Sequence, residues 1–305
     1  METGRASMTA LITAFRRAYH YSHDTPRIFE DSLAGVLLSA QDRRAVEDVF
    51  VDSLVKFYPD LAPPSVDREV ALAHAMRLSP GEPLVLGRAR YTEDKLAEGL
   101  RNGISQYVII GAGLDTFALR RRDLSERLQI FELDHPATQN FKRQRLREAG
   151  LAAPPNLHFG AADLERESVA AALSQLPYDP RAPTFFAWLG VTMYLTRNAI
   201  VETLRSIRSA AAPGSELAFD YIDAAGFLPG NASPGVGMVL DVTRSLGEPL
   251  IFGFDPALLR AELSAVGFDL LEDMAPQEQG ERFFNDRADG LRAWDFGRFA
   301  HARVC

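Results

Sequence analysis

Glycines and acidic residues at the ends of two apolar runs could bind a nucleoside. Residues 107–110 form a short apolar run, which predicts a buried strand. The backbone must then turn tightly, and can approach a ligand closely, at Gly111, Ala112 and Gly113. Residues 117–128 suit a helix, and residues 130–133 predict a second strand that ends at Asp134. Strand, glycine turn, helix, strand and acid follow one another as in a nucleotide-binding βαβ unit.

One position departs from the fingerprint of dinucleotide-binding proteins. The pattern G-x-G-x-x-G requires a third glycine, and this chain has Thr116 there. The third glycine allows the helix to pack tightly beneath a pyrophosphate. A ligand with a ribose and no pyrophosphate fits this turn better than a nicotinamide cofactor. S-adenosylmethionine is such a ligand, and an NAD-dependent oxidoreductase is the alternative.

Three carboxylates near this turn are candidate ligand contacts. Glu132 and Asp134 follow Gly111 by 21 and 23 residues and project from the same face of the strand, because side chains alternate. We assign the ribose hydroxyls to Asp134, at the end of the strand, with Glu132 as second choice. The alternative for Glu132 is a buried, hydrogen-bonded carboxylate. Asp115 either caps the following helix or contacts the ligand.

Several motifs together resemble the leucine carboxyl methyltransferase family. They are Gly-Ala-Gly-Leu-Asp-Thr at 111–116, Phe-Glu-Leu-Asp-His-Pro at 131–136, and shorter segments at 87–91, 162–164, 192–196 and 7–31. The family includes bacterial S-adenosylmethionine-dependent O-methyltransferases that act on small molecules. The resemblance implies an α/β fold of the class I methyltransferase type. This is a Rossmann-like, doubly wound sheet, mostly parallel with an antiparallel last strand, beneath an N-terminal helical cap.

The resemblance also implies roles for individual residues. Asp163 would accept a hydrogen bond from the adenine amino group, with Leu164 packed near the base; capping a helix is the alternative for Asp163. Arg88 would bind the methionine carboxylate, in competition with Arg90. Trp188, at the end of the fourth strand, and Leu189, which follows it, would also contact the cofactor. Protein-directed members of the family have a glutamate where this chain has Leu189, so the acceptor is expected to be a more apolar small molecule.

The sequence offers no convincing general base. Tyr21, His20 and His23 are weak candidates at the end of the first helix, which closes over the cofactor in the resembled family. Tyr21, Tyr91 and Tyr194 could line an acceptor site. A carboxylate acceptor is already ionised at pH 7 and needs no base, so we expect a methyl ester as product. A phenol or alcohol acceptor, which would benefit from a base, is the alternative; a noncatalytic cofactor-binding protein is another.

Composition narrows the class of protein. A net charge of -8 argues against nucleic-acid binding, and the chain contains no run of 18 apolar residues that could span a membrane. The sole cysteine is Cys305, so disulfide scaffolds and cysteine-based zinc sites are excluded. No spacing typical of metal ligands is present, and no metal is expected. Without a secretory signal pattern, the cytoplasm is the expected location. The oligomeric state cannot be predicted.

The order of predicted elements gives a helical N-terminal cap (1–100) and a cofactor-binding core (101–305). Ser7 is a candidate N-cap, and helices are expected near 8–19, 46–57 and 66–78. Further strands are expected at 157–160, 184–188, 216–221 and 268–272. Residues 298–304 suit a last strand at the edge of the sheet. Residues 226–237 are rich in glycine and proline and predict a mobile loop.

Overall fold

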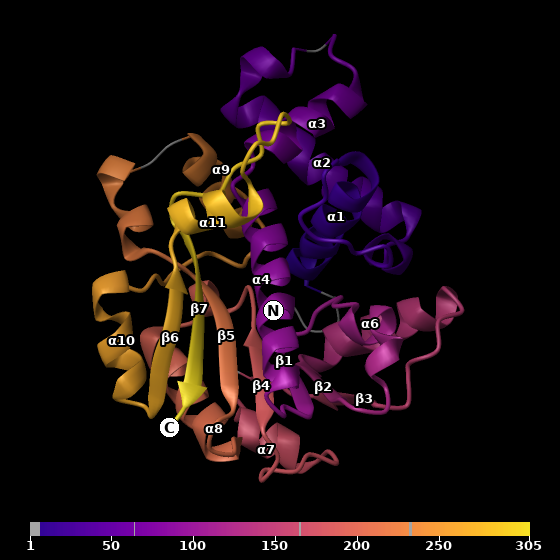
Figure 1. Ribbon diagram of the computed structural model, residues 1–305. Helices are drawn as coiled ribbons and strands as arrows, with labels where there is room; N and C mark the ends of the chain where they lie inside the picture. The colour runs from indigo at the N-terminus through magenta and orange to yellow at the C-terminus, as the bar shows by residue number, and fades with distance from the viewer. Residues whose placement is uncertain (1–6, 64, 165, 232–233) are drawn as a thin grey trace.

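The computed structural model describes residues 7–63, 65–164, 166–231 and 234–305. Its centre is a seven-stranded sheet of order β3-β2-β1-β4-β5-β7-β6 (Figure 1). The strands are β1 (Gln106–Ile110), β2 (Gln129–Asp134), β3 (Leu157–Ala161), β4 (Thr184–Trp188), β5 (Glu216–Ile222), β6 (Phe268–Met274) and β7 (Gly297–Val304). Strands β1 to β5 pair in parallel, and the order reverses at β1. The predicted doubly wound, mostly parallel sheet is therefore confirmed.

The last strand runs antiparallel as predicted, but its predicted place at the edge of the sheet is wrong. β7 lies between β5 and β6 and pairs with both. Its polar side chains suggested an edge, yet they find partners on the neighbouring strands. Arg298 pairs with Asp273 of β6 at 2.8 Å, and His301 contacts Glu216 of β5 at 3.0 Å. Cross-strand pairing of this kind allows charged residues on an interior strand.

Helices cover both faces of the sheet. On one face, α7 (Val169–Ser174), α8 (Arg197–Ala210) and α10 (Pro256–Ser264) share one apolar cluster with the strands, with α7 over β2 and β3 and α10 over β6. On the other, α4 (Gly81–Arg101) and α5 (Phe117–Arg120) cover Tyr107, Ile109 and Phe185. The sheet is thus buried on both sides, as parallel sheets require.

The first three helices form a separate apolar cluster above the sheet. They are α1 (Met8–His23), α2 (Ala40–Phe57) and α3 (Arg68–Leu78). Ser7 accepts a hydrogen bond from the backbone of Ala10, so its predicted role as N-cap of α1 is confirmed. α4 was not predicted as a helix and, unlike the other three, contacts β4, β5 and β7. The division into a cap (1–100) and a core (101–305) stays a prediction.

Two predicted segments differ in the structure. The helix expected over 117–128 is limited to α5 and a short 3-10 turn, because the chain instead inserts Leu124 and Leu128 into the cluster that contains Leu96 of α4. The predicted loop at 226–237 contains two 3-10 turns, Ala224–Phe227 and Pro229–Asn231, and the start of α9 (Pro234–Ser245). Residues 232–233 lie outside the described residues, and mobility of this segment stays a prediction.

Gly226 shows that a glycine of this segment serves packing. A Cβ atom at this position would lie 2.9 Å from the ring of Phe296, so the glycine permits close packing.

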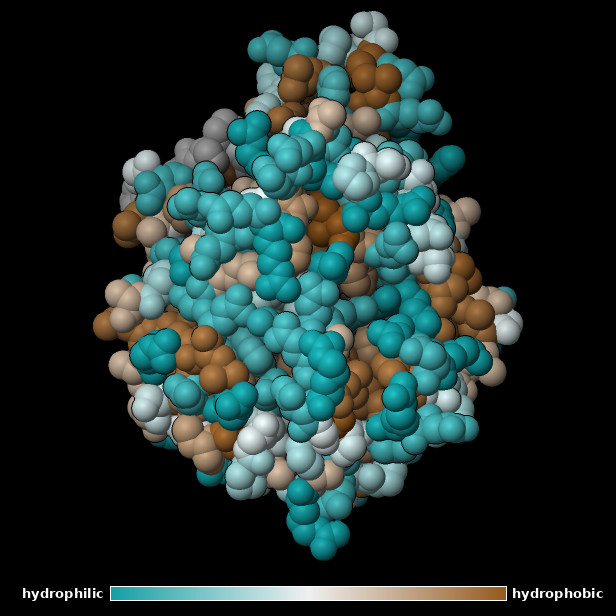
Figure 2. Space-filling view, in the orientation of Figure 1, coloured by the Kyte–Doolittle hydropathy of each residue, from teal (hydrophilic) through white to brown (hydrophobic). Residues whose placement is uncertain are grey.

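The remaining helices are α6 (Pro136–Glu148) and α11 (Pro276–Phe283). Within the described residues, no helix has the length and apolar character needed to cross a membrane. Polar side chains dominate the face shown in Figure 2, where hydrophobic ones gather in smaller patches.

Candidate active site

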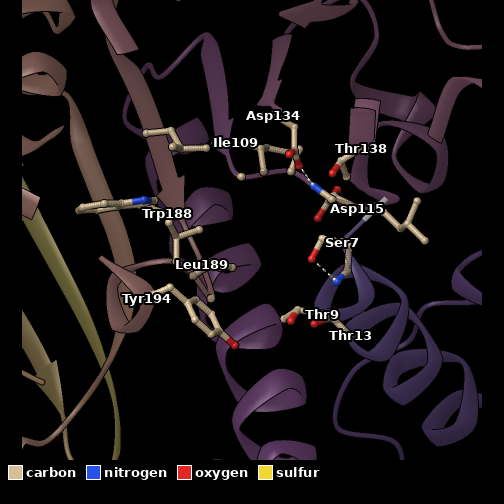
Figure 3. Close-up of a pocket in the computed structure, with 18 of the residues that line it drawn as sticks. Ser7, Thr9, Thr13, Ile109, Asp115, Asp134, Thr138, Trp188, Leu189 and Tyr194 are labelled. Atoms are coloured by element: carbon tan, nitrogen blue, oxygen red, sulfur yellow. Dashed lines mark hydrogen bonds between the residues drawn. The ribbon is translucent and has the colours of Figure 1, made fainter. Parts of the chain in front are cut away.

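A cavity of about 740 Å³ opens where the carboxyl ends of β1 to β4 meet the N-terminal helices. This is where ligands bind in open α/β sheets. Figure 3 shows Trp188, Leu189 and Tyr194 on one side of it, and Ser7 with Thr9 and Thr13 of α1 on the other. The structure brings most of the predicted cofactor residues to its wall: Arg88, Gly111, Ala112, Gly113, Asp115, Asp134, Asp163, Leu164, Trp188 and Leu189.

The glycine turn has the geometry that its composition predicts. Gly111 and Gly113 have φ values of 71° and 52°, in the left-handed region that side chains disfavour. A Cβ atom on Gly111 would also lie 2.7 Å from Val191, and one on Gly113 would lie 3.3 Å from Ala10 of α1. Backbone atoms of the turn therefore form the wall of the cavity directly.

Asp134 and Glu132 occupy different environments. Asp134 accepts hydrogen bonds from the backbone N–H groups of Gly113 and His135, and it lines the cavity. Burial nevertheless raises its pKa. Glu132 does not reach the cavity wall, because its carboxylate is buried in a 2.5 Å ion pair with Lys142 of α6. The structure thus selects the structural alternative for Glu132, whose pKa burial raises to about 7.

Two further carboxylates lie at the cavity wall with local partners. Asp163 follows β3 and lies 3.5 Å from Arg166, next to Leu164. Asp115 accepts a 2.7 Å hydrogen bond from the backbone of Phe117 at the start of α5. Asp115 therefore caps the short helix, and it also faces the cavity, so both roles weighed for it are structurally open.

Arg88 and Arg90 are separated by their positions on α4. Arg88 is buried at the cavity wall and its Nη1 donates to Asp220 of β5 at 2.8 Å. The other oxygen of Asp220 accepts from the backbone of Gly190 at 2.6 Å, which ties α4 to the loop after β4. Arg90 is exposed, pairs with Asp94 at 2.9 Å, and does not line the cavity. The structure therefore favours Arg88.

The three weak catalytic candidates lie away from the cavity. His20 is buried, contacts Asp24 through Nδ1 at 2.5 Å, and accepts the backbone N–H of Ile28 at Nε2. His23 is exposed and stacks on Tyr19, with ring centroids 4.1 Å apart. Tyr21 packs beneath the guanidinium of Arg27. These contacts are structural, so none of the three candidates is placed to act on an acceptor.

The tyrosines proposed for an acceptor site divide in the same way. Tyr91 is buried and donates to Glu272 at 3.1 Å, outside the cavity. Tyr194 follows β4 and lines the cavity beside Leu189 (Figure 3). Burial raises the pKa of Tyr194 to about 12, so its phenol keeps its proton at neutral pH.

Sequence reasoning missed several residues of the cavity wall. Glu248, after α9, accepts hydrogen bonds from Ser7 at 3.0 Å and from Thr9, which joins two distant segments across the cavity. No motif marks Glu248, because its position depends on the fold of a long connection. On the other side, α4, α5 and β1 contribute polar residues, namely Thr92, Glu93, Tyr107 and Arg120. Helical spacing from Arg88 would have pointed to Thr92, had α4 been predicted.

Comparison with known proteins identifies the chain. The family model of leucine carboxyl methyltransferases matches residues 10–208. The chain belongs to the leucine carboxyl methyltransferase family. The Bacillus subtilis (strain 168) protein YktD is 34% identical over 315 residues, covering 99% of each chain, and its name assigns it provisionally as an S-adenosyl-L-methionine-dependent methyltransferase. A similarly named Mycolicibacterium smegmatis protein is 30% identical over 68% of this chain and 72% of its own length.

Solved structures agree on the fold of this methyltransferase. A DUF574 family protein from Streptomyces avermitilis superposes with a TM-score of 0.56 at 15% identity, over 98% of each chain. A Thermobifida fusca protein, described provisionally as a methyltransferase, gives a TM-score of 0.52 at 18% identity, over 99% of this chain and 96% of its own. The chain is an S-adenosylmethionine-dependent methyltransferase with a class I fold.

A buried cluster of the methyltransferase has the residue types of a metal site. Within the described part of the chain, His20, Asp24 and Glu82 bring ligand atoms within 4.8 Å of one another. Arg77 is bonded to Asp24, and Arg16 lies 3.3 Å from Glu82, so both acidic side chains already have a guanidinium partner. The cluster ties α1 to α3 and α4, away from the cavity. That the enzyme works without a metal stays a prediction.

Proposed function

We propose that this methyltransferase methylates a carboxylate of a small, largely apolar molecule and forms a methyl ester. The observation that carries the proposal is the lining of the cavity beyond the glycine turn. Five apolar residues face it there: Leu189, Val191, Leu195, Pro249 and Ile251. An apolar lining removes water from an acceptor but offers little to a charged peptide chain. Ile251 is also 53% exposed, which provides an apolar entrance.

The positions of the wall residues support one orientation of the cofactor. Asp163 and Leu164 would hold the adenine, Asp134 the ribose hydroxyls, and Arg88 the methionine carboxylate. S-adenosylmethionine supplies an activated methyl group when it is bound, so the chain needs mainly to position the two reactants and exclude water. Leu189 and Tyr194 lie where they would orient the acceptor. The phenol of Tyr194 keeps its proton, so it can donate a hydrogen bond to an acceptor carboxylate.

One observation favours a second candidate, methylation of a hydroxyl group. Glu248 presents a carboxylate at the cavity wall, between Ser7 and Thr9. A carboxylate in this position could take the proton of an alcohol or phenol acceptor. It would repel an acceptor carboxylate unless the loop that carries it moved away.

The chemical stability of the product separates the two candidates. The full-length enzyme would be incubated with methyl-labelled S-adenosylmethionine and a panel of apolar carboxylic acids, phenols and alcohols. Mild alkali cleaves a methyl ester and releases labelled methanol, whereas it leaves a methyl ether intact. We expect alkali-labile product from the carboxylic acids only. Alkali-stable product, lost in Glu248→Gln, would instead establish the hydroxyl acceptor.

The pH dependence of the rate gives a second criterion. A carboxylate with an ordinary pKa of about 4 is ionised throughout the neutral range, so the rate should stay nearly flat between about pH 6 and 9. With a hydroxyl acceptor, the rate should rise with pH until the base that takes its proton is deprotonated.

We also propose a cytoplasmic location and the absence of nucleic-acid partners.

A further inference from the structure

One end of the cavity carries charged groups that the acceptor does not need. It lies between α4 and β1, where Glu93, Tyr107 and Arg120 reach the wall together with Arg88. The proposed sites for adenine and ribose lie at the ends of β3 and β2. The amino-acid end of the cofactor must therefore point the other way, past the glycine turn toward α4. Any role of these charged groups in cofactor binding rests on this placement, and so on the proposed function.

The two arginines at this end differ in how fully they are bonded. Arg120 donates through Nε to Thr116 at 2.9 Å and through both terminal nitrogens to Glu93. Among the described residues, Arg88 hydrogen-bonds only Asp220, through one of its nitrogens. Arg88 thus uses one of its five N–H donors within the protein and Arg120 uses three, so Arg88 has more donors left for a carboxylate. The carboxylate of the methionine end accordingly belongs at Arg88.

The ammonium group on the same carbon then needs hydrogen-bond acceptors. Glu93 lies five residues after Arg88 on α4, and both reach the cavity. Its carboxylate offers about four lone-pair positions, and Arg120 does not use all of them. The side chain is 20% exposed, which leaves it open to the cavity. Asp31 is less suitable, because Arg17, Thr116 and two backbone N–H groups already surround it.

A second acceptor lies beside Glu93. Tyr107 is only 3% exposed, yet it lines the cavity. Within the described part of the chain, no hydrogen bond to its phenol is formed, although Phe117 and Phe185 hold its ring edge-on. A buried phenol that faces a cavity without a partner indicates that a ligand completes the site. Glu93 and Asp115 line the same cavity as this phenol.

We propose that Glu93 binds the α-ammonium group of the cofactor's methionine end, with the phenol oxygen of Tyr107 as second acceptor. Arg88 and Glu93 together then recognise the zwitterion, a positive group for the carboxylate and a negative one for the ammonium. Glu93 is a positioning residue, since it acts on a part of the cofactor remote from the transferred methyl group. It fixes where the sulfur lies relative to Leu189 and Tyr194.

Three ligands test the proposal by calorimetry with the full-length chain. S-adenosylhomocysteine carries the complete methionine end, its desamino analogue lacks only the ammonium, and 5′-methylthioadenosine lacks the whole amino acid. Glu93→Gln should raise the dissociation constant of S-adenosylhomocysteine by about tenfold or more, as expected for loss of a charged hydrogen bond. It should change the affinity of the other two ligands by less than about twofold, because neither can reach Glu93 with a cation.

Control variants separate this role from its alternatives. Glu98→Gln changes an exposed carboxylate on the same helix, paired with Lys95, and should leave all three affinities unchanged. Asp115→Asn keeps the helix cap and tests the neighbouring carboxylate. The proposal is overturned if Glu93→Gln lowers the affinity for all three ligands equally, or for none of them. It is also overturned if only Asp115→Asn lowers the affinity for S-adenosylhomocysteine while leaving that for the other two ligands unchanged.

Two measurements keep the proposal testable should Glu93→Gln fail to fold. The unmodified enzyme should bind the desamino analogue at least about tenfold more weakly than S-adenosylhomocysteine. Tyr107→Phe keeps the ring and removes the phenol oxygen. It should therefore reduce the difference in affinity between S-adenosylhomocysteine and its desamino analogue. Equal binding of the two ligands by the unmodified enzyme would refute the proposal. Failure here leaves the proposed function intact if Asp134→Ala still weakens every ligand that contains the ribose.

Discussion

At the level of single residues, the structure separates two acids that the sequence placed on the same strand face. Asp134 and Glu132 differ because Lys142, ten residues further along, reaches back to Glu132. An ion pair of this kind depends on how α6 packs, so strand alternation alone could not reveal it. The same holds for Glu248, whose partners Ser7 and Thr9 lie about 240 residues earlier in the chain.

The Glu132–Lys142 pair leads to a prediction about stability. Both side chains are almost fully buried, so Glu132→Gln leaves the ammonium of Lys142 without a counter-charge. Loss of one partner of a buried pair typically costs about 3 kcal/mol. We expect a lower free energy of unfolding in urea and an unchanged affinity for S-adenosylhomocysteine, because Glu132 lies outside the cavity. A variant of normal stability with weakened ligand binding would show that Glu132 contacts the cofactor after all.

Glu82 leads to a prediction about pH. Burial raises its pKa to about 8, against about 4.3 in an unfolded chain. Between these values the unfolded chain has lost the proton and the folded one keeps it, so stability falls as pH rises. Glu82→Gln removes this dependence. The melting temperature of Glu82→Gln minus that of the unmodified protein should therefore be at least about 3 °C larger at pH 8 than at pH 5. A change of roughly 1 kcal/mol in the free energy of unfolding produces such a shift.

The exposed variant Glu98→Gln serves as the control for this comparison. Its melting temperature should follow that of the unmodified protein across the same range. If the difference in melting temperature between Glu82→Gln and the unmodified protein stayed constant with pH, Glu82 would be ionised in the folded protein throughout this range.

At the level of elements, the chain's own pattern predicted the sheet well. Five parallel strands were located because their apolar runs end in glycine or acidic residues. α4 was missed because Pro80, Gly81, Pro83 and Gly87 suggest a break, whereas the structure uses Gly87 for close contact with Phe299. The place of β7 was missed because a polar pattern does not distinguish an edge strand from an interior strand with charged partners.

The first helix is expected to respond to the cofactor. Ala10 packs on Gly113, and Ser7 and Thr9 hold Glu248 across the cavity, so α1 closes one side of the site. We predict that amide hydrogen exchange over residues 8–20 slows when S-adenosylhomocysteine is added, since the ligand would rest against this helix. The end of β7, far from the cavity, provides the reference. Protection confined to the glycine turn would argue against closure by α1.

At the level of the whole molecule, the cavity exists only because three distant parts of the chain meet. The strand ends supply the glycine turn and Asp134, α4 supplies Arg88, and α1 with the segment after α9 closes the opposite side. The motifs near β1 and β2 could be recognised in sequence because they are local. The other walls depend on long-range packing, and their residues became candidates only in the folded structure.

The central claim is that Asp134, at the end of β2, holds the ribose of the cofactor in this cavity. Titration calorimetry of S-adenosylhomocysteine with the unmodified enzyme and with Asp134→Ala tests it most directly. We predict binding to the unmodified enzyme and a loss of tenfold or more in the variant, about 1.4 kcal/mol, with the melting temperature of the free protein largely retained. Equal dissociation constants for the two proteins would contradict the proposed site.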